Sequence, residues 1–228
     1  MRWVSLFAAA ISAAGLVACA GARPEPPERL VYLAVGASDA AGLGAEPITR
    51  GYVFQIADEL DDRIDVVLLA NLAVPGANTE QLDEALELFL ETNVEPGLVT
   101  VWTGANDLIR GQDADDFEDE LEELFARLRD RTDGVIAAAN IPDLTELPRF
   151  RDDPDEDVTQ ERVEEFNEAI AAQAEDHDVL LVDLYGEGVE DDLVSDEDGF
   201  HPNNEGHRQI ADRFLDVILP ALGLAPTT

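Results

Sequence analysis

The stretch Leu30–Gly44, which reads LVYLAVGASDAAGLG, limits the fold of this chain more than any other. Its first part, Leu30–Val35, is a near-continuous apolar run, as is typical of a strand buried on both faces of a parallel sheet. The small residues Gly-Ala-Ser-Asp then break the run. A turn of this kind can hold a hydroxyl at the carboxyl edge of the sheet, where open α/β folds keep their sites. Ser38 is therefore a candidate functional residue, and the structural alternative is an ordinary helix cap at Ser38 or Asp39.

The remainder of the chain alternates between segments with helical spacing of apolar residues and short apolar runs. Helices are predicted over Ile48–Asp62, Thr79–Glu91, Asp116–Asp130, Val158–Glu175 and Asn204–Leu222. Further strands are predicted over Ile64–Ala70, Leu98–Trp102, Gly134–Ala139 and Val179–Val182. Strands separated by helices favour parallel pairing, so we expect an α/β fold: a three-layer α/β/α sandwich around a five-stranded parallel sheet. The longest irregular segment, Pro142–Asp157, is expected to form a lid or a pocket wall.

The charge of the chain narrows the classes of partner. Asp and Glu number 51 against 14 Lys and Arg, and all of the latter are arginine. Binding to nucleic acid needs clustered cations, so this composition argues against a nucleic-acid partner. The acids are interleaved with periodic apolar residues, and 46% of the chain is hydrophobic. We therefore expect a folded domain with an acidic surface rather than a disordered acidic tail.

The N-terminus carries a pattern of its own. Arg2 precedes the apolar segment Val4–Ala18, which is short for a membrane span and typical of a secretory signal. The tetrapeptide that ends at Cys19, Leu-Val-Ala-Cys, resembles the bacterial lipobox, in which the cysteine is lipidated and becomes the first mature residue. Cys19 is the one cysteine of the chain, which leaves no disulfide within a monomer. A plain cleaved signal and an uncleaved anchor are the alternatives.

These patterns divide the chain into three predicted parts. We predict a lipoprotein signal peptide over 1–18, a Pro-rich tether over 19–28, and one folded domain over 29–224. The protein is then expected to be exported and held at a membrane of the cell envelope through Cys19, on its periplasmic or extracellular face.

Polar or small residues follow several of the predicted strands. Gly76 comes after the second strand, where it could present a bare backbone N–H to a ligand. Asn106 comes after the third strand and offers a side-chain amide. Asp198 and His201 are three residues apart near the end of the chain, a spacing that lets the carboxylate orient the imidazole. Turn geometry, a helix cap and a surface pair are the respective structural alternatives.

The order of these residues is more specific than any one of them. Over about Arg29 to Leu222 the chain resembles the SGNH hydrolases, the GDSL-like esterase/lipase family. The four blocks of that family carry Ser, Gly, Asn and His, which fall here on Ser38, Gly76, Asn106 and His201. The resemblance implies a flavodoxin-like SGNH hydrolase fold.

The resemblance also implies a mechanism, acyl transfer to water by a serine esterase or lipase. Ser38 is expected to attack the ester carbonyl, His201 to carry the proton, and Asp198 to fix the imidazole tautomer. The N–H groups of Ser38 and Gly76 and the amide of Asn106 are expected to form the oxyanion hole. No metal and no cofactor are needed.

Some residues depart from this pattern or compete with it. Ala37 stands where the family has the aspartate of Gly-Asp-Ser, which puts the local hydrogen bonding of the turn in doubt. The stretch Asn140–Thr145 resembles the one that follows the fourth strand in the family. Asp196 is an alternative orienting acid, although its offset from His201 fits a single turn less well. We expect His177 to lie at the surface and His207 to be structural.

Two other functions remain open from the sequence. One is a carbohydrate deacetylase of the same family, because fold and triad do not fix the substrate. The other is a non-catalytic, lipid-anchored binding protein. The expected partners are a small-molecule or lipid ester and, through Cys19, a membrane. An acidic protein of this kind is expected to prefer neutral esters over anionic ones.

Overall fold

The computed structural model of the chain describes residues 24–186, 188 and 190–226. The expected signal peptide over 1–18 and the lipidation site Cys19 lie outside the described residues, and the limits of the tether and the domain stay predictions. At the start of the described chain, the Pro24 carbonyl packs so closely on Gly223 that a Cβ there would lie 1.9 Å from the oxygen. The end of the expected tether therefore lies against the C-terminal part of the domain. No helix among these described residues is long and apolar enough to cross a membrane.

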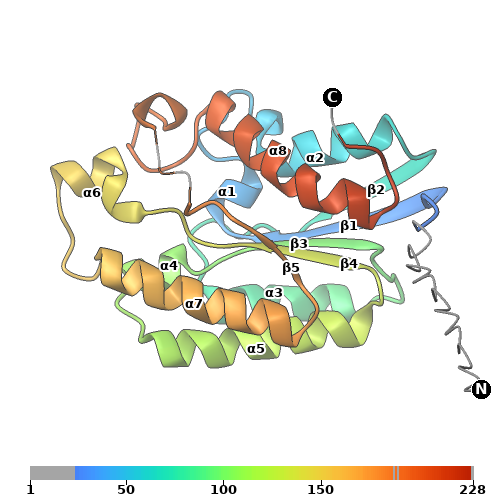
Figure 1. Cartoon of the computed structure of the whole chain (residues 1–228), viewed down its shortest axis with the longest axis horizontal. Coiled ribbons are helices and arrows are strands. Elements are labelled where there is room, and N and C mark those ends of the chain that lie inside the picture. Colours follow the sequence, from blue (N-terminus) through green and yellow to red (C-terminus); the bar gives the residue numbers. More distant parts are fainter. Residues whose placement is uncertain (1–23, 187, 189, 227–228) are drawn as a thin grey trace, which may run out of the picture.

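A single sheet of five parallel strands forms the centre of the molecule (Figure 1). The strands are β1 (Arg29–Gly36), β2 (Val66–Asn71), β3 (Leu98–Trp102), β4 (Val135–Ala139) and β5 (Leu180–Val182). Their order, β2-β1-β3-β4-β5, is that of the flavodoxin-like doubly wound folds. The expected α/β class and the five-stranded parallel sheet are confirmed. Because β1 lies between β2 and β3, the chain order reverses at β1, where such folds bind ligands.

Helices cover both faces of the sheet and complete the three layers (Figure 1). On one face lie α2 (Tyr52–Asp61) and α8 (Asn204–Ala221), and on the other lie α3 (Thr79–Leu90), α5 (Ala114–Arg131) and α7 (Gln160–Asp176). Each face has its own apolar cluster of buried side chains. Stacked rings lie in each: Tyr52 on Phe214 at 5.4 Å between centroids, and Phe117 on Phe166 at 4.5 Å. The sheet is therefore buried on both sides.

Short elements connect the long ones at the carboxyl edge of the sheet. These are α1 (Ser38–Ala41), α4 (Ala105–Ile109), α6 (Pro148–Asp152) and the 3₁₀ turns η1 (Ile48–Arg50), η2 (Leu144–Glu146) and η3 (Asp191–Leu193). Their lengths are too small for a periodic apolar pattern to reveal them. The segment Pro142–Asp157 is therefore not irregular throughout, since it contains η2 and α6.

Polar caps fix where two of the long helices begin. Before α3, the Asn78 side chain accepts a hydrogen bond from the Gln81 N–H, and the Gln81 side chain accepts one from the Asn78 N–H. Before α8, the Asn203 side chain accepts hydrogen bonds from two N–H groups of the first turn. These caps also fix the loops that carry Gly76 and His201.

Two predicted elements differ from the structure for identifiable reasons. The second strand begins at Val66, and Leu68 is 52% exposed, because β2 is an edge strand rather than a strand buried on both faces. The predicted helix Ile48–Asp62 is divided into η1 and α2 at Gly51. Gly51 has an extended backbone, with a φ of -60° and a ψ of 152°, and a Cβ there would lie 2.6 Å from the Cα of Gly42.

Candidate active site

Ser38 lies at the first position of α1, separated by one residue from strand β1, which lies between β2 and β3. Ser38 is buried, with 6% of the residue exposed. Ala37 is the N-cap residue of α1. Its methyl side chain makes no capping hydrogen bond, so the turn lacks the hydrogen bond that an aspartate could make at this position. The helix ends after one turn at Gly42, whose φ of 88° is left-handed. The strand, the turn and the early helix end together place Ser38 at the carboxyl edge of the sheet.

Asp198 and His201 form a hydrogen-bonded pair in the turn before α8. Asp198 Oδ2 lies 2.5 Å from His201 Nδ1, and Oδ1 accepts hydrogen bonds from the Phe200 and His201 N–H groups at 2.9 and 3.0 Å. Burial raises the pKa of Asp198, but the hydrogen bonds from His201 and the two N–H groups outweigh it and hold that pKa below its usual value. Asp198 is therefore a carboxylate acceptor, and it is this acid, not the exposed Asp196, that contacts the imidazole.

A close backbone approach joins the segment after Ser38, residues 36–46 (the serine segment), to residues 195–207 (the histidine segment). Gly44 has a φ of 86°, and a Cβ there would lie 2.1 Å from the Pro202 carbonyl oxygen and 3.0 Å from the Cβ of His201. Only glycine fits this approach without moving the backbone. The contact places His201 beside the turn that carries Ser38.

Two side chains of α8 reinforce this junction. His207 Nε2–H donates to the Leu43 carbonyl at 2.8 Å, and Nδ1 accepts the Tyr52 N–H at 3.3 Å. Burial lowers the pKa of His207, which fits this neutral tautomer and its expected structural role. The Asn204 side chain accepts from the Glu46 N–H at 2.8 Å and donates to the Glu46 carbonyl at 2.9 Å.

Ser38 and Asn106 line one small crevice at the edge of the sheet, together with Asp39, Trp102 and Phe200. Asn106 belongs to α4, which follows β3 directly, so two neighbouring strands deliver the hydroxyl and the amide to the same place. Phe200 comes from the histidine segment, and its ring packs edge-on against His201 at 4.9 Å between centroids. The structure thus places the predicted serine and asparagine in one crevice, and His201 packs against Phe200, which borders that crevice.

Gly76 lies in the loop after β2, residues 72–78 (the glycine loop). Its φ is 79°, and nothing lies within 4 Å of where a Cβ would be. The Gly76 carbonyl accepts a hydrogen bond from Arg110, and the Ala77 carbonyl accepts one from Asn106 Nδ2 at 2.9 Å. Gly76 does not line the crevice of Ser38; it lines a shallow depression beside Arg110. Its place in an oxyanion hole stays a prediction.

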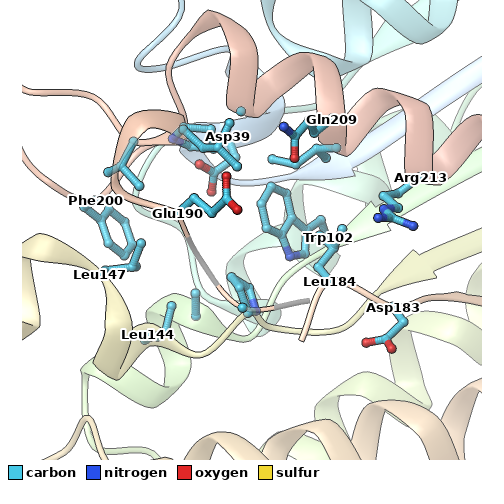
Figure 2. A pocket seen from close by; sticks show the side chains of 18 residues that line it. Asp39, Trp102, Leu144, Leu147, Asp183, Leu184, Glu190, Phe200, Gln209 and Arg213 are labelled. Atoms are coloured by element: carbon cyan, nitrogen blue, oxygen red, sulfur yellow. The ribbon is translucent and has the colours of Figure 1, made fainter. Parts of the chain in front are cut away.

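A cavity of about 280 Å³ opens beside the crevice and shares Asp39, Trp102, Ala105 and Phe200 with it (Figure 2). Most of the remaining wall is apolar and comes from the segments after β4 and β5 and from α8. The apolar residues are Pro142, Leu144, Leu147, Leu184, Leu193, Val194, Pro202 and Ile210. The expectation that the segment Pro142–Asp157 forms a pocket wall is confirmed for its first half.

Several residues of the site were not found by sequence reasoning. Trp102 ends β3, and its indole N–H donates to the Asn140 carbonyl at 3.2 Å, which holds the ring between crevice and cavity. The available signal is that Asn140 begins the family-like stretch Asn140–Thr145. For Asp39 the sequence indicates only a helix-cap role, although this residue lines both the crevice and the cavity. His177, expected at the surface, is partly buried against the Phe125 ring.

Comparison with known proteins gives a consistent set of relatives. The sequence model described as the GDSL-like Lipase/Acylhydrolase family matches residues 34–209. The chain is 26% identical over 221 residues to the uncharacterized protein YpmR of Bacillus subtilis (strain 168), covering 84% of this chain and 82% of that protein.

Solved structures share the fold. The psychrotrophic esterase EstA from Pseudoalteromonas sp. has a TM-score of 0.66 at 22% identity, over 82% of this chain and 96% of that one. The lipase/acylhydrolase from Enterococcus faecalis has a TM-score of 0.65 at 21% identity, over 87% and 99%. The acetyl xylan esterase AlAXEase has a TM-score of 0.63 at 20% identity, over 83% and 100%. At these identities the likeness concerns the fold alone.

Proposed function

The chain belongs to the GDSL-like lipase/acylhydrolase family, and from this premise we propose that it is a serine esterase whose acyl-enzyme forms on Ser38. One observation carries the proposal. The imidazole of His201 is hydrogen-bonded to the Asp198 carboxylate. The segment that carries His201 packs against the segment after Ser38 at Gly44, where there is no room for a side chain. A nucleophile with an oriented base beside it is the arrangement that acyl transfer needs.

The reaction follows from these positions. Ser38 Oγ attacks the ester carbonyl carbon while His201 Nε2 takes the hydroxyl proton. The tetrahedral intermediate collapses, the C–O bond to the alcohol breaks, and the alcohol leaves with that proton. Water then attacks the acyl-serine with His201 again as base, and the acid and Ser38 are released. Asp198 stabilises the imidazolium in both steps because it stays ionised against Nδ1.

Three groups could donate hydrogen bonds to the oxyanion: the N–H groups of Ser38 and Gly76 and the side-chain amide of Asn106. Along the described chain, neither the Ser38 N–H nor the Gly76 N–H donates a hydrogen bond to another group. Asn106 uses one amide hydrogen on the Ala77 carbonyl, and an amide carries a second. Each such donor contributes roughly 10²–10³ to the rate.

The apolar part of the cavity lining supports an ester with a hydrocarbon acyl or alcohol group. Leucine, valine, isoleucine and proline supply eight of its lining residues, and such residues fit the hydrocarbon part of an ester. An acetylated oligosaccharide serves as the comparison substrate, since a structurally similar protein is an acetyl xylan esterase.

The direct test is hydrolysis of para-nitrophenyl esters with short to medium acyl chains by the wild-type chain and by Ser38→Ala. We expect turnover by the wild type, none by Ser38→Ala, and wild-type turnover by Asp61→Asn, which removes one exposed acid at the end of α2. Hydrolysis confined to the acetylated oligosaccharide would replace the esterase by a deacetylase. No hydrolysis of any ester would favour the binding protein.

We further propose that the protein is an exported lipoprotein held at a membrane of the cell envelope through Cys19. The support is the sequence Leu-Val-Ala-Cys at the end of a short apolar segment. A single acyl chain binds membranes weakly, so firm retention would need two or more. Mass spectrometry of the membrane fraction should find a lipidated mature N-terminus at Cys19, and an unmodified N-terminus elsewhere would contradict this.

A further inference from the structure

Asp39, the residue after the proposed nucleophile, lies between the crevice of Ser38 and the large cavity. Its side chain lines the crevice that contains Ser38 and Asn106, and it also lines the large cavity. Any ester whose carbonyl reaches Ser38 must therefore pass beside the Asp39 carboxylate. Asp39 is also held in place, because α1 ends one turn later and its carbonyl accepts the Gly42 N–H at 3.0 Å.

The cavity lining carries more carboxylates than cations. The lining contains the carboxylates of Asp39, Glu190 and Asp183 and one guanidinium, Arg213. In the close view, Asp39 and Glu190 lie on one side of Trp102, while Asp183 and Arg213 lie on the other (Figure 2). Arg213 lowers the pKa of Asp183, although the Asn140 hydrogen bond to Asp183 is the larger cause. In the described part of the chain, the Asp39 carboxylate forms no ion pair and accepts no hydrogen bond from a side chain.

Aromatic rings flank this carboxylate. Trp102 and Phe200 line both the crevice and the cavity together with Asp39. The Trp102 indole is held by its hydrogen bond to the Asn140 carbonyl. Aromatic faces beside an unpaired carboxylate attract alkylammonium groups through cation–π and Coulomb interactions. The same carboxylate repels an anion. The Phe200 ring already lies 5.4 Å from one cation, the Arg149 guanidinium.

On the basis of the proposed esterase function, we propose that Asp39 is a specificity-determining residue that selects substrates by charge. The site takes esters with an alkylammonium group within a few bonds of the scissile carbonyl and discriminates against esters with a carboxylate there. At a separation of several ångströms in a partly screened site, one unit charge changes kcat/KM by about tenfold in each direction.

The protonation of Asp39 gives this selectivity a pH dependence. Burial raises the pKa of Asp39 to about 6, and the electrostatic interaction with His201 opposes the rise. Asp39 is therefore largely neutral below this value and charged above it, so the preference for cations grows as the pH rises through about 6. Other charged or titratable groups also face Asp39 or the cavity beside it. They are His201, Asp198, Tyr52, Glu190, Asp183 and Arg213.

The experiment compares substrates of equal shape. One pair is butyrylcholine and the ester in which carbon replaces the ammonium nitrogen, which puts the charge on the alcohol side. A second pair is para-nitrophenyl trimethylammonio-butanoate and its carbon isostere, which puts the charge on the acyl side. Para-nitrophenyl hydrogen adipate supplies the anion. The quantity measured is the ratio of kcat/KM for charged and neutral substrates within each variant, so that changes in overall turnover cancel.

We expect the wild type to prefer the cation over its isostere on at least one side of the ester, by about tenfold at about pH 8 and much less at about pH 5. Asp39→Asn should bring that ratio close to one at both pH values and should raise the relative rate on the adipate ester. Asp61→Asn, which removes an equal charge far from the cavity, should keep the wild-type ratio. Asp39→Ser serves if the asparagine variant folds poorly.

A wild-type enzyme that hydrolyses neutral esters but shows ratios that Asp39→Asn leaves unchanged would overturn the inference and leave the esterase proposal standing. If no ester is hydrolysed, binding decides instead. Butyltrimethylammonium ion should then quench or shift the tryptophan fluorescence, to which Trp102 contributes, and Asp39→Asn should weaken that binding about tenfold. Equal binding by both proteins would overturn the inference in that case.

Discussion

The two sides of the site are built in different ways. The serine segment and the histidine segment meet by direct backbone approach, with Gly44 against Pro202, and the buried His207 closes the junction. The glycine loop is instead held by hydrogen bonds to side chains of α4 and of Arg110, the residue that follows it. Arg110 and Asn106 donate to two successive carbonyls of this loop, and the Thr79 N–H after it donates to Asp107 Oδ1 at 2.8 Å.

This difference teaches where each side tolerates change. A closely packed junction has no free space, so an added methyl group displaces one segment relative to the other. A loop held by several hydrogen bonds loses them one at a time, and the remaining ones keep its position. We therefore expect the junction of Ser38 and His201 to fail abruptly and the glycine loop to fail gradually.

The largest effect is expected from removing the reacting groups. Ser38→Ala and His201→Ala should each lower kcat/KM for a para-nitrophenyl ester by at least about 10³-fold, because neither group can act without the other. Asp198→Ala should cost less, since an orienting acid acts through the imidazole. Circular dichroism and thermal melts serve as the control for folding. Near-native turnover by Ser38→Ala would remove Ser38 as the nucleophile.

The junction itself is tested by Gly44→Ala. The new Cβ would meet the Pro202 carbonyl at 2.1 Å, so the two segments must separate, and a misplacement of this order lowers kcat by about 10²-fold. Gly76→Ala is the matched control for stability, because its φ of 79° imposes similar backbone strain in open space. The melting temperature should fall more for Gly44→Ala. Equal decreases would show that strain alone is responsible.

On the other side, Asn106→Ala should lower kcat by about 10²-fold with little change in KM, because the amide acts chiefly on the transition state. Steady-state kinetics on one ester separates the two constants. A change confined to KM would recast Asn106 as a substrate-binding or structural residue.

The fold was largely predictable from the sequence because buried parallel strands and amphipathic helices have distinct apolar periods. Ser38, Asn106 and His201 could be found since each follows a strand or precedes a helix in a fixed order. Of the cavity, the sequence indicates only the wall within Pro142–Asp157, because the other walls come from segments that only the folded chain brings together. The charge state of Asp39 depends on the same burial, so its sequence position shows only a possible helix cap.

A smaller effect is expected from Arg110→Ala. The guanidinium donates to the Gly76 carbonyl at the surface, while Asn106 and Asp107 still hold the loop. We expect kcat to fall by only about two- to fivefold, since exposed interactions of arginine contribute little. A decrease in kcat as large as that of Asn106→Ala would show that the remaining hydrogen bonds do not hold the glycine loop in position.

The smallest effect concerns stability on the serine side. The pKa of Asp39 is raised by burial, so its ionised form destabilises the folded state above about pH 6, and this cost is absent below the ordinary aspartate value. Asp39→Asn should therefore raise the melting temperature at about pH 8 by a few degrees and by less at about pH 4. Asp61→Asn is the control for net charge. A difference that does not vary with pH would contradict the assigned shift.

The central claim, that Ser38 is a nucleophile activated by His201, is tested most directly by covalent labelling. The full chain is treated with an alkyl fluorophosphonate, which reacts with activated serines and leaves its phosphonyl group on the oxygen. Mass spectrometry of the peptides should find one phosphonyl group, on Ser38, with labelling absent in Ser38→Ala and strongly slowed in His201→Ala. Labelling of another residue, or an unlabelled Ser38 in a chain that still hydrolyses esters, would contradict the account.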